Sequence, residues 1–368
     1  MPTIAVSAIT DPKEFEALEN ELKPFFDLYS NNPFLLLPFL KKIVQFLPKG
    51  TAPLFLIARA QGRIIGVAPF MLNQKFAYRS SNFLLKCELS PDFIVNDAFR
   101  DLFLESVLAV AFKKLRVQSL ILDIPHASPN REVIERICSK NSFALSKQPN
   151  SDSKNHSVIY TGGSWENFQQ TMGSRYRKRF RKIEKTIQGE GQYRILSFVG
   201  KENPDKLDYI YDSILEVERL SWKQTWRSQH SQEYDDDLMW LWQSSVSAQE
   251  DPAFQWLVHF LELNSQVIAY VFAINYKGTT YIGKTSFVDK YRSLYPGLFL
   301  MNSALKFAMN TTGIYKIDFL TNLDFFKIWR PSCEVRTTIA VNALIPRLLQ
   351  NTQNKCQLVY SKFQKLIA

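Results

Sequence analysis

Hydrophobic residues in the first half of the chain recur at two different periods, which predicts alternating helices and strands. Two β-rich runs, 54–60 and 63–72, are separated only by Gln61-Gly62, and this spacing is typical of a hairpin. A short apolar run over 119–124 indicates a buried strand. Apolar spacings of three and four residues predict helices over 11–28, 34–46, 101–115 and 130–139.

The second half of the chain shows the same alternation. Helices are predicted over 165–172, 205–224 and 298–309, and strands over 193–199, 255–263, 266–276, 279–288 and 316–320. Residues 57–70 (IARAQGRIIGVAPF) also align with residues 260–273 (FLELNSQVIAYVFA), because each segment ends a strand, turns in two residues and begins another strand. This alignment favours a duplicated unit of the α/β (α+β) class, with chance similarity between two hairpins as the alternative.

Chain length and one polar segment together predict two domains. The chain has 368 residues, which exceeds the size that one hydrophobic core usually serves. Residues 147–156 are polar and rich in residues that break helices and strands, which is typical of a linker or a long hairpin loop. We therefore expect a first domain over 1–150 and a second domain over 151–368.

Positive charge is concentrated in one segment. Lys and Arg outnumber Asp and Glu by 45 to 35, and the net charge of +10 indicates an anionic partner: nucleic acid, a phosphorylated cofactor or a membrane surface. The densest run lies in 174–188, where Tyr176, Phe180, Ile183 and Ile187 recur at helical spacing and predict an amphipathic basic helix. Three interpretations of this helix stay open: it is a solvated surface helix, it binds phosphate, or it binds nucleic acid. No nucleic-acid module accompanies the run, and the helix lacks the exposed Leu or Trp of a membrane-surface helix.

Several chemistries are not expected from the motifs. The four Cys and four His residues lack the spacing of a zinc clip, a redox pair or a nucleophile triad, so we expect no metal centre. The chain contains no Walker loop, GxGxxG, GxSxG or HExxH motif. No apolar run approaches the roughly 20 residues of a membrane-spanning helix, and no leader peptide is evident at the start. We therefore expect a cytoplasmic protein without a transmembrane segment.

A candidate anion site lies at a predicted helix start. A strand leads into Tyr295-Pro296-Gly297-Leu298, and a helix begins there, so free backbone N–H groups and the positive end of the helix dipole would suit a pyrophosphate. Arg292 adds charge beside this turn. A plain Pro-Gly turn that starts a helix is the alternative.

Two further groups of residues are candidates for catalysis. Glu218 and Trp222 share a helix face, and a carboxylate beside an indole in a partly dry site can have a raised pKa, as a general base for an amine needs. Asp318 ends a predicted strand, and a polar loop then leads to Lys327 and Trp329, so these side chains could converge on a cleft. The alternatives are a surface Glu over a core Trp, an Asp318 ion pair and a packed Trp329.

The order of the motifs resembles a known family. The segments that carry the resemblance are Asn32–Phe34, Gly66–Pro69, Trp165–Phe168, Ser174–Arg179, Glu218–Lys223, Leu261–Ala269, Asp289–Leu298, Ile317–Phe319 and Phe326–Trp329. This order is similar to that of GNAT-superfamily acyltransferases of the CelD-like group, which is associated with bacterial polysaccharide and cellulose biosynthesis, and more distantly to that of FemAB-like aminoacyl transferases. The resemblance covers residues 10 to 345. The sequence departs from the family at Thr321-Asn322, where Gly is usual, and lacks the fuller Gly-rich loop.

The resemblance implies a fold and a donor. It implies two GNAT-like domains in tandem, each with a mixed, mostly antiparallel twisted sheet flanked by helices. It also implies that acyl-CoA, such as acetyl-CoA, binds to the second domain. The residues that would hold this donor are Tyr291, Arg292, Tyr295, Pro296, Gly297 and Leu298.

The function implied is N-acyl transfer by direct attack of an amine on the acyl thioester. The acceptor would be an amino sugar, a polysaccharide precursor or another small amine, bound by Trp222, Lys327 and Trp329. Glu218 is the first candidate for the general base and Asp318 the second. Two alternatives stay open: a non-catalytic basic binding protein on a degenerate acyltransferase fold, and FemAB-like transfer from aminoacyl-tRNA, which would suit the basic helix. No other nucleic-acid partner is expected.

Overall fold

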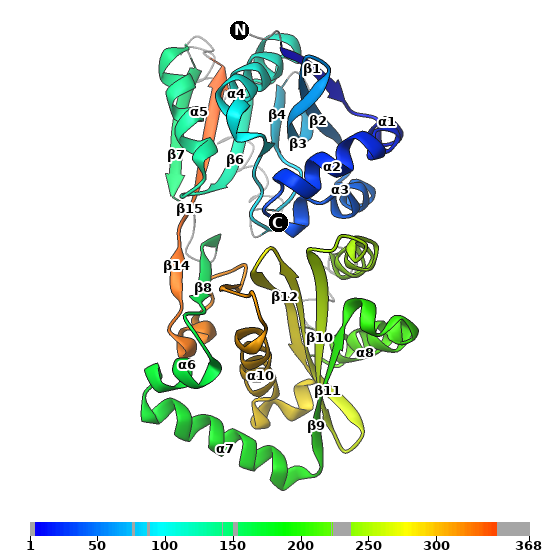
Figure 1. Cartoon of the computed structure of the whole chain (residues 1–368), viewed down its shortest axis with the longest axis vertical. Helices are drawn as coiled ribbons and strands as arrows, with labels where there is room; N and C mark the ends of the chain where they lie inside the picture. Colours follow the sequence, from blue (N-terminus) through cyan, green and yellow to red (C-terminus); the bar gives the residue numbers. More distant parts are fainter. Residues whose placement is uncertain are drawn as a thin grey trace, which may run out of the picture.

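The protein consists of two sheet-containing units stacked along its longest axis (Figure 1). The computed structural model describes residues 4–75, 78–86, 89–141, 143–149, 154–221, 223 and 237–343. Within these residues, no helix is long and apolar enough to cross a membrane.

The first unit contains a mixed sheet with the strand order β1-β2-β3-β4-β6-β15-β7, and β5 pairs with β3. Its strands are β1 (Ile4–Ile9), β2 (Thr51–Ala60), β3 (Arg63–Lys75), β4 (Tyr78–Phe83), β5 (Ile94–Val95), β6 (Ser119–Pro125), β7 (Phe143–Pro149) and β15 (Arg336–Ala343). Its helices are α1 (Pro12–Ala17), α2 (Glu19–Tyr29), α3 (Leu37–Ile43), α4 (Arg100–Ala109), which continues as a π turn over Val110–Lys114, and α5 (Pro129–Lys140).

The second unit has the strand order β14-β8-β13-β12-β11-β10-β9. Its strands are β8 (His156–Tyr160), β9 (Tyr193–Val199), β10 (Phe254–Leu263), β11 (Gln266–Tyr276), β12 (Thr279–Phe287), β13 (Lys316–Asp318) and β14 (Ser332–Glu334). Its helices are α6 (Trp165–Thr171), α7 (Ser174–Glu190), α8 (Leu207–Arg219), a helical segment over 237–248, α10 (Pro296–Asn310), and the 3-10 helices η9 (Asp289–Leu294) and η10 (Asp324–Trp329).

The two sheets are built alike. In each sheet one pair is parallel, β4 with β6 and β12 with β13, and the other pairs are antiparallel. The aligned hairpins β2–β3 and β10–β11 also share a register shift just before the turn, after Ala58 and after Leu261. Both turns have positive φ at two successive residues, as a two-residue hairpin turn requires. The predicted fold of two tandem units with mixed, mostly antiparallel sheets is confirmed.

Strand β15 connects the units across the predicted domain division. Sheet membership follows the division near residue 150 except for β15, which lies between β6 and β7 in the first sheet (Figure 1). Its apolar residues Ile339 and Val341 are fully buried in the core of the first unit, which explains this placement. Residues 147–149, predicted as part of a linker or loop, are the end of β7 and pair with β15.

An apolar core joins the two units. Residues of α2, α3 and the turn before α3 share one buried cluster with one face of the second sheet. Within this cluster, Trp240 Nε1 donates to the Phe39 carbonyl (3.1 Å), and the Tyr276 hydroxyl donates to the Ser30 carbonyl (3.2 Å). The units are therefore joined by a continuous hydrophobic interface.

The helix predicted over 205–224 is shorter in the structure. Helix α8 ends at Arg219, because Ser221 forms a bridge with Val288 and the Asp289 N–H donates to the Leu220 carbonyl. The chain after α8 is thereby held against the end of β12, and this brings Glu218 close to that strand.

Candidate functional site

Strands β12 and β13 separate soon after they pair. Only three residue pairs form this parallel ladder, and the last of them joins Tyr281 to Asp318. Strand β12 then shifts register against β11 at Gly283 and continues to Phe287. Since β13 ends at Asp318, the second half of β12 has an open edge on that side among the described strands.

A cavity of about 680 Å³ lies at this open edge. Phe287, Leu298, Phe325 and Ile328 give it largely apolar walls. Its other lining residues are Arg179, Thr285, Ser286, Arg292, Tyr295, Gly297 and Asp324. The Ser286 hydroxyl is buried and has no hydrogen-bond partner among the described residues, so a polar group of a ligand could satisfy it. The cavity combines apolar walls with a few polar groups, as small-molecule sites do.

The start of α10 forms one side of the cavity. Tyr295 has left-handed backbone (φ 54°), and Pro296 then opens the helix. The N–H groups of Gly297 and Leu298 belong to the first turn, where no carbonyl of the same helix can accept them, and the dipole is positive. A Cβ on Gly297 would lie 3.1 Å from a Phe287 ring carbon, so glycine allows the helix start to approach β12.

Four of the six residues predicted to hold the donor line this cavity. They are Arg292, Tyr295, Gly297 and Leu298. Pro296 is buried in the first turn of α10. Tyr291 lies elsewhere, because its hydroxyl donates to Gln266 Oε1 (2.9 Å) at the start of β11. Arg179 also lines the cavity, although the sequence indicated it only as part of the basic helix.

Glu218 lies on the α8 side of β12 in a buried polar cluster. Its side chain is fully buried, and its Oε1 accepts a hydrogen bond from the Tyr270 hydroxyl. Lys223 Nζ lies 3.5 Å from the same oxygen and donates to the carbonyl of Thr285 (2.9 Å). Lys223 therefore connects Glu218 to a residue of the cavity wall. Glu218 Oε2 is buried and has no hydrogen-bond partner among the residues described.

Lys284 adds a partly buried charge near this cluster. Burial lowers the pKa of its amine to about 8, against the opposing effects of Glu218 and Asp237, which raise it. A charged side chain is seldom buried without a functional or structural reason. Lys284 was not predicted from the sequence, because β12 (TTYIGKTSF) is rich in hydroxyl residues and a lysine does not stand out in it.

Asp318 lies in different surroundings. Its Oδ1 interacts with His156 Nδ1 (2.9 Å) and accepts from the Leu320 N–H (2.8 Å). Burial alone would raise the pKa of this carboxyl, but the hydrogen bond from His156 and the charges of His156 and Lys316 hold it below its usual value. Asp318 lines a second cavity of about 670 Å³, whose walls come from both units. The structure thus does not place Asp318 in the cluster that contains Glu218.

Of the three residues predicted to bind the acceptor, the two that the structure describes, Lys327 and Trp329, are not brought together. Trp329 is fully buried, and its Nε1 donates to Asn302 Oδ1 (3.3 Å) within the core. Lys327 is exposed and forms an ion pair with Asp324 (2.6 Å). Trp222 lies outside the described residues.

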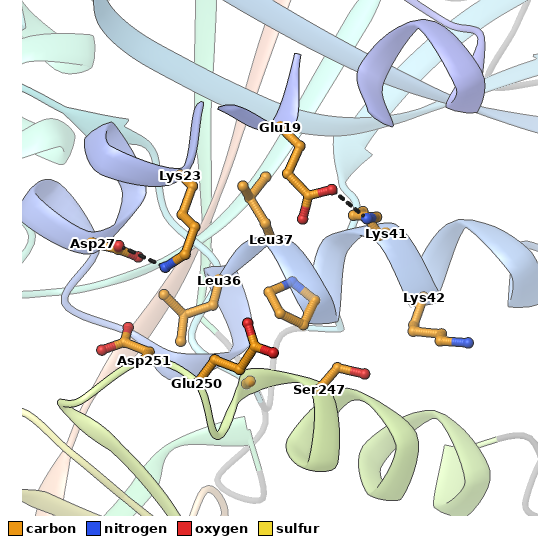
Figure 2. Close-up of a pocket in the computed structure, with 12 residues that line it drawn as sticks. Glu19, Lys23, Asp27, Leu36, Leu37, Lys41, Lys42, Ser247, Glu250 and Asp251 are labelled. Atoms are coloured by element: carbon orange, nitrogen blue, oxygen red, sulfur yellow. Dashed lines mark hydrogen bonds and ion pairs between the residues drawn. The ribbon is translucent and has the colours of Figure 1, made fainter. Parts of the chain in front are cut away.

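In a third cavity, of about 370 Å³, four of the charged lining residues form two ion pairs. It lies between helices α2 and α3 and residues 247–251 (Figure 2). Figure 2 shows that Lys23 pairs with Asp27 (2.9 Å) and Lys41 with Glu19 (2.8 Å). Within the described part of the chain, no group of His, Cys, Asp and Glu could hold a metal ion.

Two solved structures with a TM-score above 0.5 share the fold of this chain. A conserved protein of unknown function from Bacteroides thetaiotaomicron is similar to this chain with a TM-score of 0.55 and 12% identity, over 93% of this chain and 100% of that chain. The C-terminal domain of a putative lysylphosphatidylglycerol synthetase from Agrobacterium fabrum has a TM-score of 0.51 and 11% identity, over 94% and 96%. A tandem GNAT protein of the clavulanic acid pathway has a TM-score of 0.46 and 9% identity, over 94% and 99%.

Sequence comparison matches part of the second unit to a family model. No curated protein matches the chain at a significant level. Residues 174–327 match the family model of the acetyltransferase (GNAT) domain, and this range runs from α7 to η10 and includes the cavity at the start of α10. The chain therefore has the fold of two GNAT-like units in tandem, and residues 174–327 of its second unit are similar to the acetyltransferase (GNAT) domain.

Proposed function

We propose that the protein is an N-acyltransferase that moves an acyl group from acyl-CoA to an amine. The observation that carries this proposal is the cavity at the open edge of β12, which joins a helix start, two arginines and apolar walls. Its position within the GNAT-matched segment supports the same assignment.

The residues of the cavity fit an acyl-CoA molecule. The first-turn N–H groups at Gly297 and Leu298 would bind the pyrophosphate, and Arg179 and Arg292 would add charge. The apolar walls would hold the pantetheine arm. The unpartnered Ser286 hydroxyl would donate to a carbonyl or sulfur of the donor.

Transfer requires one bond to form and one to break. The amine nitrogen attacks the thioester carbonyl carbon, the C–N bond forms, the C–S bond breaks, and CoA leaves as a thiolate that takes up a proton. Backbone N–H groups at the open edge of β12 would stabilise the developing oxyanion. Glu218 would accept the proton of the attacking amine at its free Oε2. The acceptor is proposed to be a small amine such as an amino sugar.

Glu218 is preferred over Asp318 as the base because of their neighbours. Glu218 is connected through Lys223 to Thr285 in the cavity wall. Asp318 already accepts hydrogen bonds from His156 and from a backbone N–H, and lines the cavity between the units instead.

The proposal is tested by a thermal-shift screen followed by an assay for released thiol. Free CoA, acetyl-CoA and a long-chain acyl-CoA are each added to the full-length protein in large excess. Binding to the folded state should raise stability by about 2.7 kcal/mol at 100 times the dissociation constant. Stabilised protein is then mixed with acyl-CoA and a panel of amines, and amine-dependent release of CoA thiol is expected.

Each of the other outcomes supports a different function. If no CoA species raises the melting temperature, the donor assignment is wrong. Stabilisation without thiol release from any amine would favour a binding protein on an acyltransferase fold. Retention of tRNA that weakens with added salt, in a protein that ignores CoA, would favour transfer from aminoacyl-tRNA.

A further inference from the structure

Helix α7 presents a stripe of cations directly away from the protein core. Tyr176, Phe180, Ile183 and Ile187 are its buried residues, and they pack in the second unit. The basic face, which we define as Arg175, Lys178, Lys182 and Lys185, lies opposite them and is exposed. A helix of this length spans about 25 Å. Figure 1 shows α7 at the end of the molecule farthest from the first unit.

This charge arrangement does not stabilise the helix. The first turn of α7 contains no acidic residue, and its cations lie at the positive end of the helix dipole. The lysines and arginine of the basic face also lie three or four residues apart, so they repel one another. A polyanion bound across the face would remove both costs.

Exposed apolar side chains lie near the Arg179 side of α7. Tyr295 is 55% exposed, Leu323 43% and Phe325 44%. Tyr295 and Phe325 line the same cavity as Arg179 of α7. The η10 segment follows Leu323, and its Trp329 packs against Phe180 of α7 (ring centroids 6.3 Å). Large apolar groups at a basic surface are typical of proteins that bind at a membrane interface.

We propose that the basic face and these apolar side chains form a peripheral docking surface for a bilayer containing anionic lipid. Lipid phosphates would pair with the four cations, and the hydrocarbon boundary would accept Tyr295, Leu323 and Phe325. The apolar residues of α7 cannot insert into the bilayer themselves, because they are buried in the second unit. The apolar contact comes instead from residues more than a hundred positions away in sequence. A nucleic acid would offer phosphates but no hydrocarbon for Leu323.

The test is co-sedimentation of the full-length protein with vesicles. Vesicles of mixed phosphatidylglycerol and phosphatidylcholine are compared with pure phosphatidylcholine, at low and at high salt. The wild-type protein should sediment only with the anionic vesicles. The triple variant K178Q/K182Q/K185Q should bind roughly 100-fold more weakly, since each lysine near an anionic surface contributes about a factor of five. The matched control is K113Q/K114Q, which changes two exposed lysines of the first unit.

A second variant separates a bilayer from other polyanions. Leu323→Ser should weaken vesicle binding but leave retention on single-stranded RNA unchanged. The proposal is wrong if the wild-type protein ignores anionic vesicles, or if the triple variant binds them as the wild type does. It is also wrong if RNA binds more tightly than vesicles and Leu323→Ser has no effect on either. The readout does not depend on acyl transfer, so failure of the proposed enzyme activity leaves this test intact.

Discussion

At the scale of single residues, the second unit keeps charged groups where a purely structural core would have apolar ones. Glu218 is fully buried with one oxygen unpartnered among the described residues, and Lys284 is partly buried. Burial of a charge costs free energy, and such groups cluster at functional sites. This combination is the physical basis for assigning the chemistry to the α8 side of β12.

Glu218→Gln should abolish most of the acyl transfer and leave donor binding unchanged. The amide keeps the shape of the side chain and still accepts from Tyr270, but it cannot take a proton from the amine. We expect a loss of about 100-fold or more in turnover, which is the usual contribution of a general base. Released thiol and CoA affinity are measured together. Glu216→Gln, on an exposed residue of the same helix, is the control; if both variants keep full turnover, the base is another group.

His259 should make stability depend on pH. Burial lowers the pKa of His259 from 6.5 to about 4. The unfolded chain therefore binds a proton that the folded chain does not as the pH falls below 6.5. The stability contributed by neutral His259 is therefore fully present above pH 6.5 and is lost as the pH falls toward 4. At about pH 5 the free energy of unfolding should be roughly 2 kcal/mol lower than above pH 6.5.

This pH dependence is measured by denaturant unfolding at several pH values. His259→Gln should flatten the decline between about pH 6.5 and pH 5. His126→Gln, at an exposed histidine, should leave it as in the wild type. Equal declines in all three proteins would mean that His259 is protonated in the folded state.

At the scale of elements, local pattern was sufficient for some segments and insufficient for others. The hairpins 54–60/63–72 and 255–263/266–276 were predicted to within a few residues of β2–β3 and β10–β11, because period and turn chemistry are local. The basic helix was predicted for the same reason. Strands β1 and β15 were missed, because their partners lie far away in sequence and β15 is polar on one face.

The site shows the same limit. The helix start at Tyr295–Leu298 was identified from its turn residues, and four of the six predicted donor-binding residues line one cavity. Trp329 could not be distinguished from a surface aromatic until packing placed it in the core. Tyr270 and Lys284, which lie near Glu218, belong to strands β11 and β12, and no local pattern could have paired them with a residue of α8.

Ile339→Ala tests whether β15 is part of the first core. Ile339 is fully buried against strands β6 and β7, although it belongs to the C-terminal part of the chain. Its truncation should cost about 2–5 kcal/mol of unfolding free energy, as for other buried isoleucines. Denaturant unfolding followed by circular dichroism measures this loss. Val335→Ala, at a residue that is 52% exposed, should change stability little.

At the scale of the whole molecule, one apolar cluster crosses from the first unit to the second. Unfolding of one unit should therefore unfold the other as well, because neither unit keeps its core without the shared cluster. The chain offers a convenient probe, because all seven Trp residues lie between Trp165 and Trp329, in the second unit.

Tryptophan fluorescence should thus report on damage made in the first unit. In Ile339→Ala, the fluorescence transition is expected to move to lower denaturant together with the circular dichroism transition, because the units unfold together. A fluorescence transition that stays at its wild-type midpoint would mean that the units unfold independently.

Calorimetric titration of CoA tests most directly whether the second unit binds this donor at the start of α10. Three proteins are compared: the wild type, Gly297→Val and Gly189→Val. A side chain on Gly297 would meet Phe287 at 3.1 Å and occupy the space beside the first-turn N–H groups, whereas nothing lies within 4 Å of a Cβ on Gly189. The wild type and Gly189→Val should bind CoA alike, and Gly297→Val should bind at least about ten-fold more weakly, a difference of about 1.4 kcal/mol. Equal affinity in all three proteins, or no heat of binding in the wild type, would mean that CoA does not bind at the start of α10.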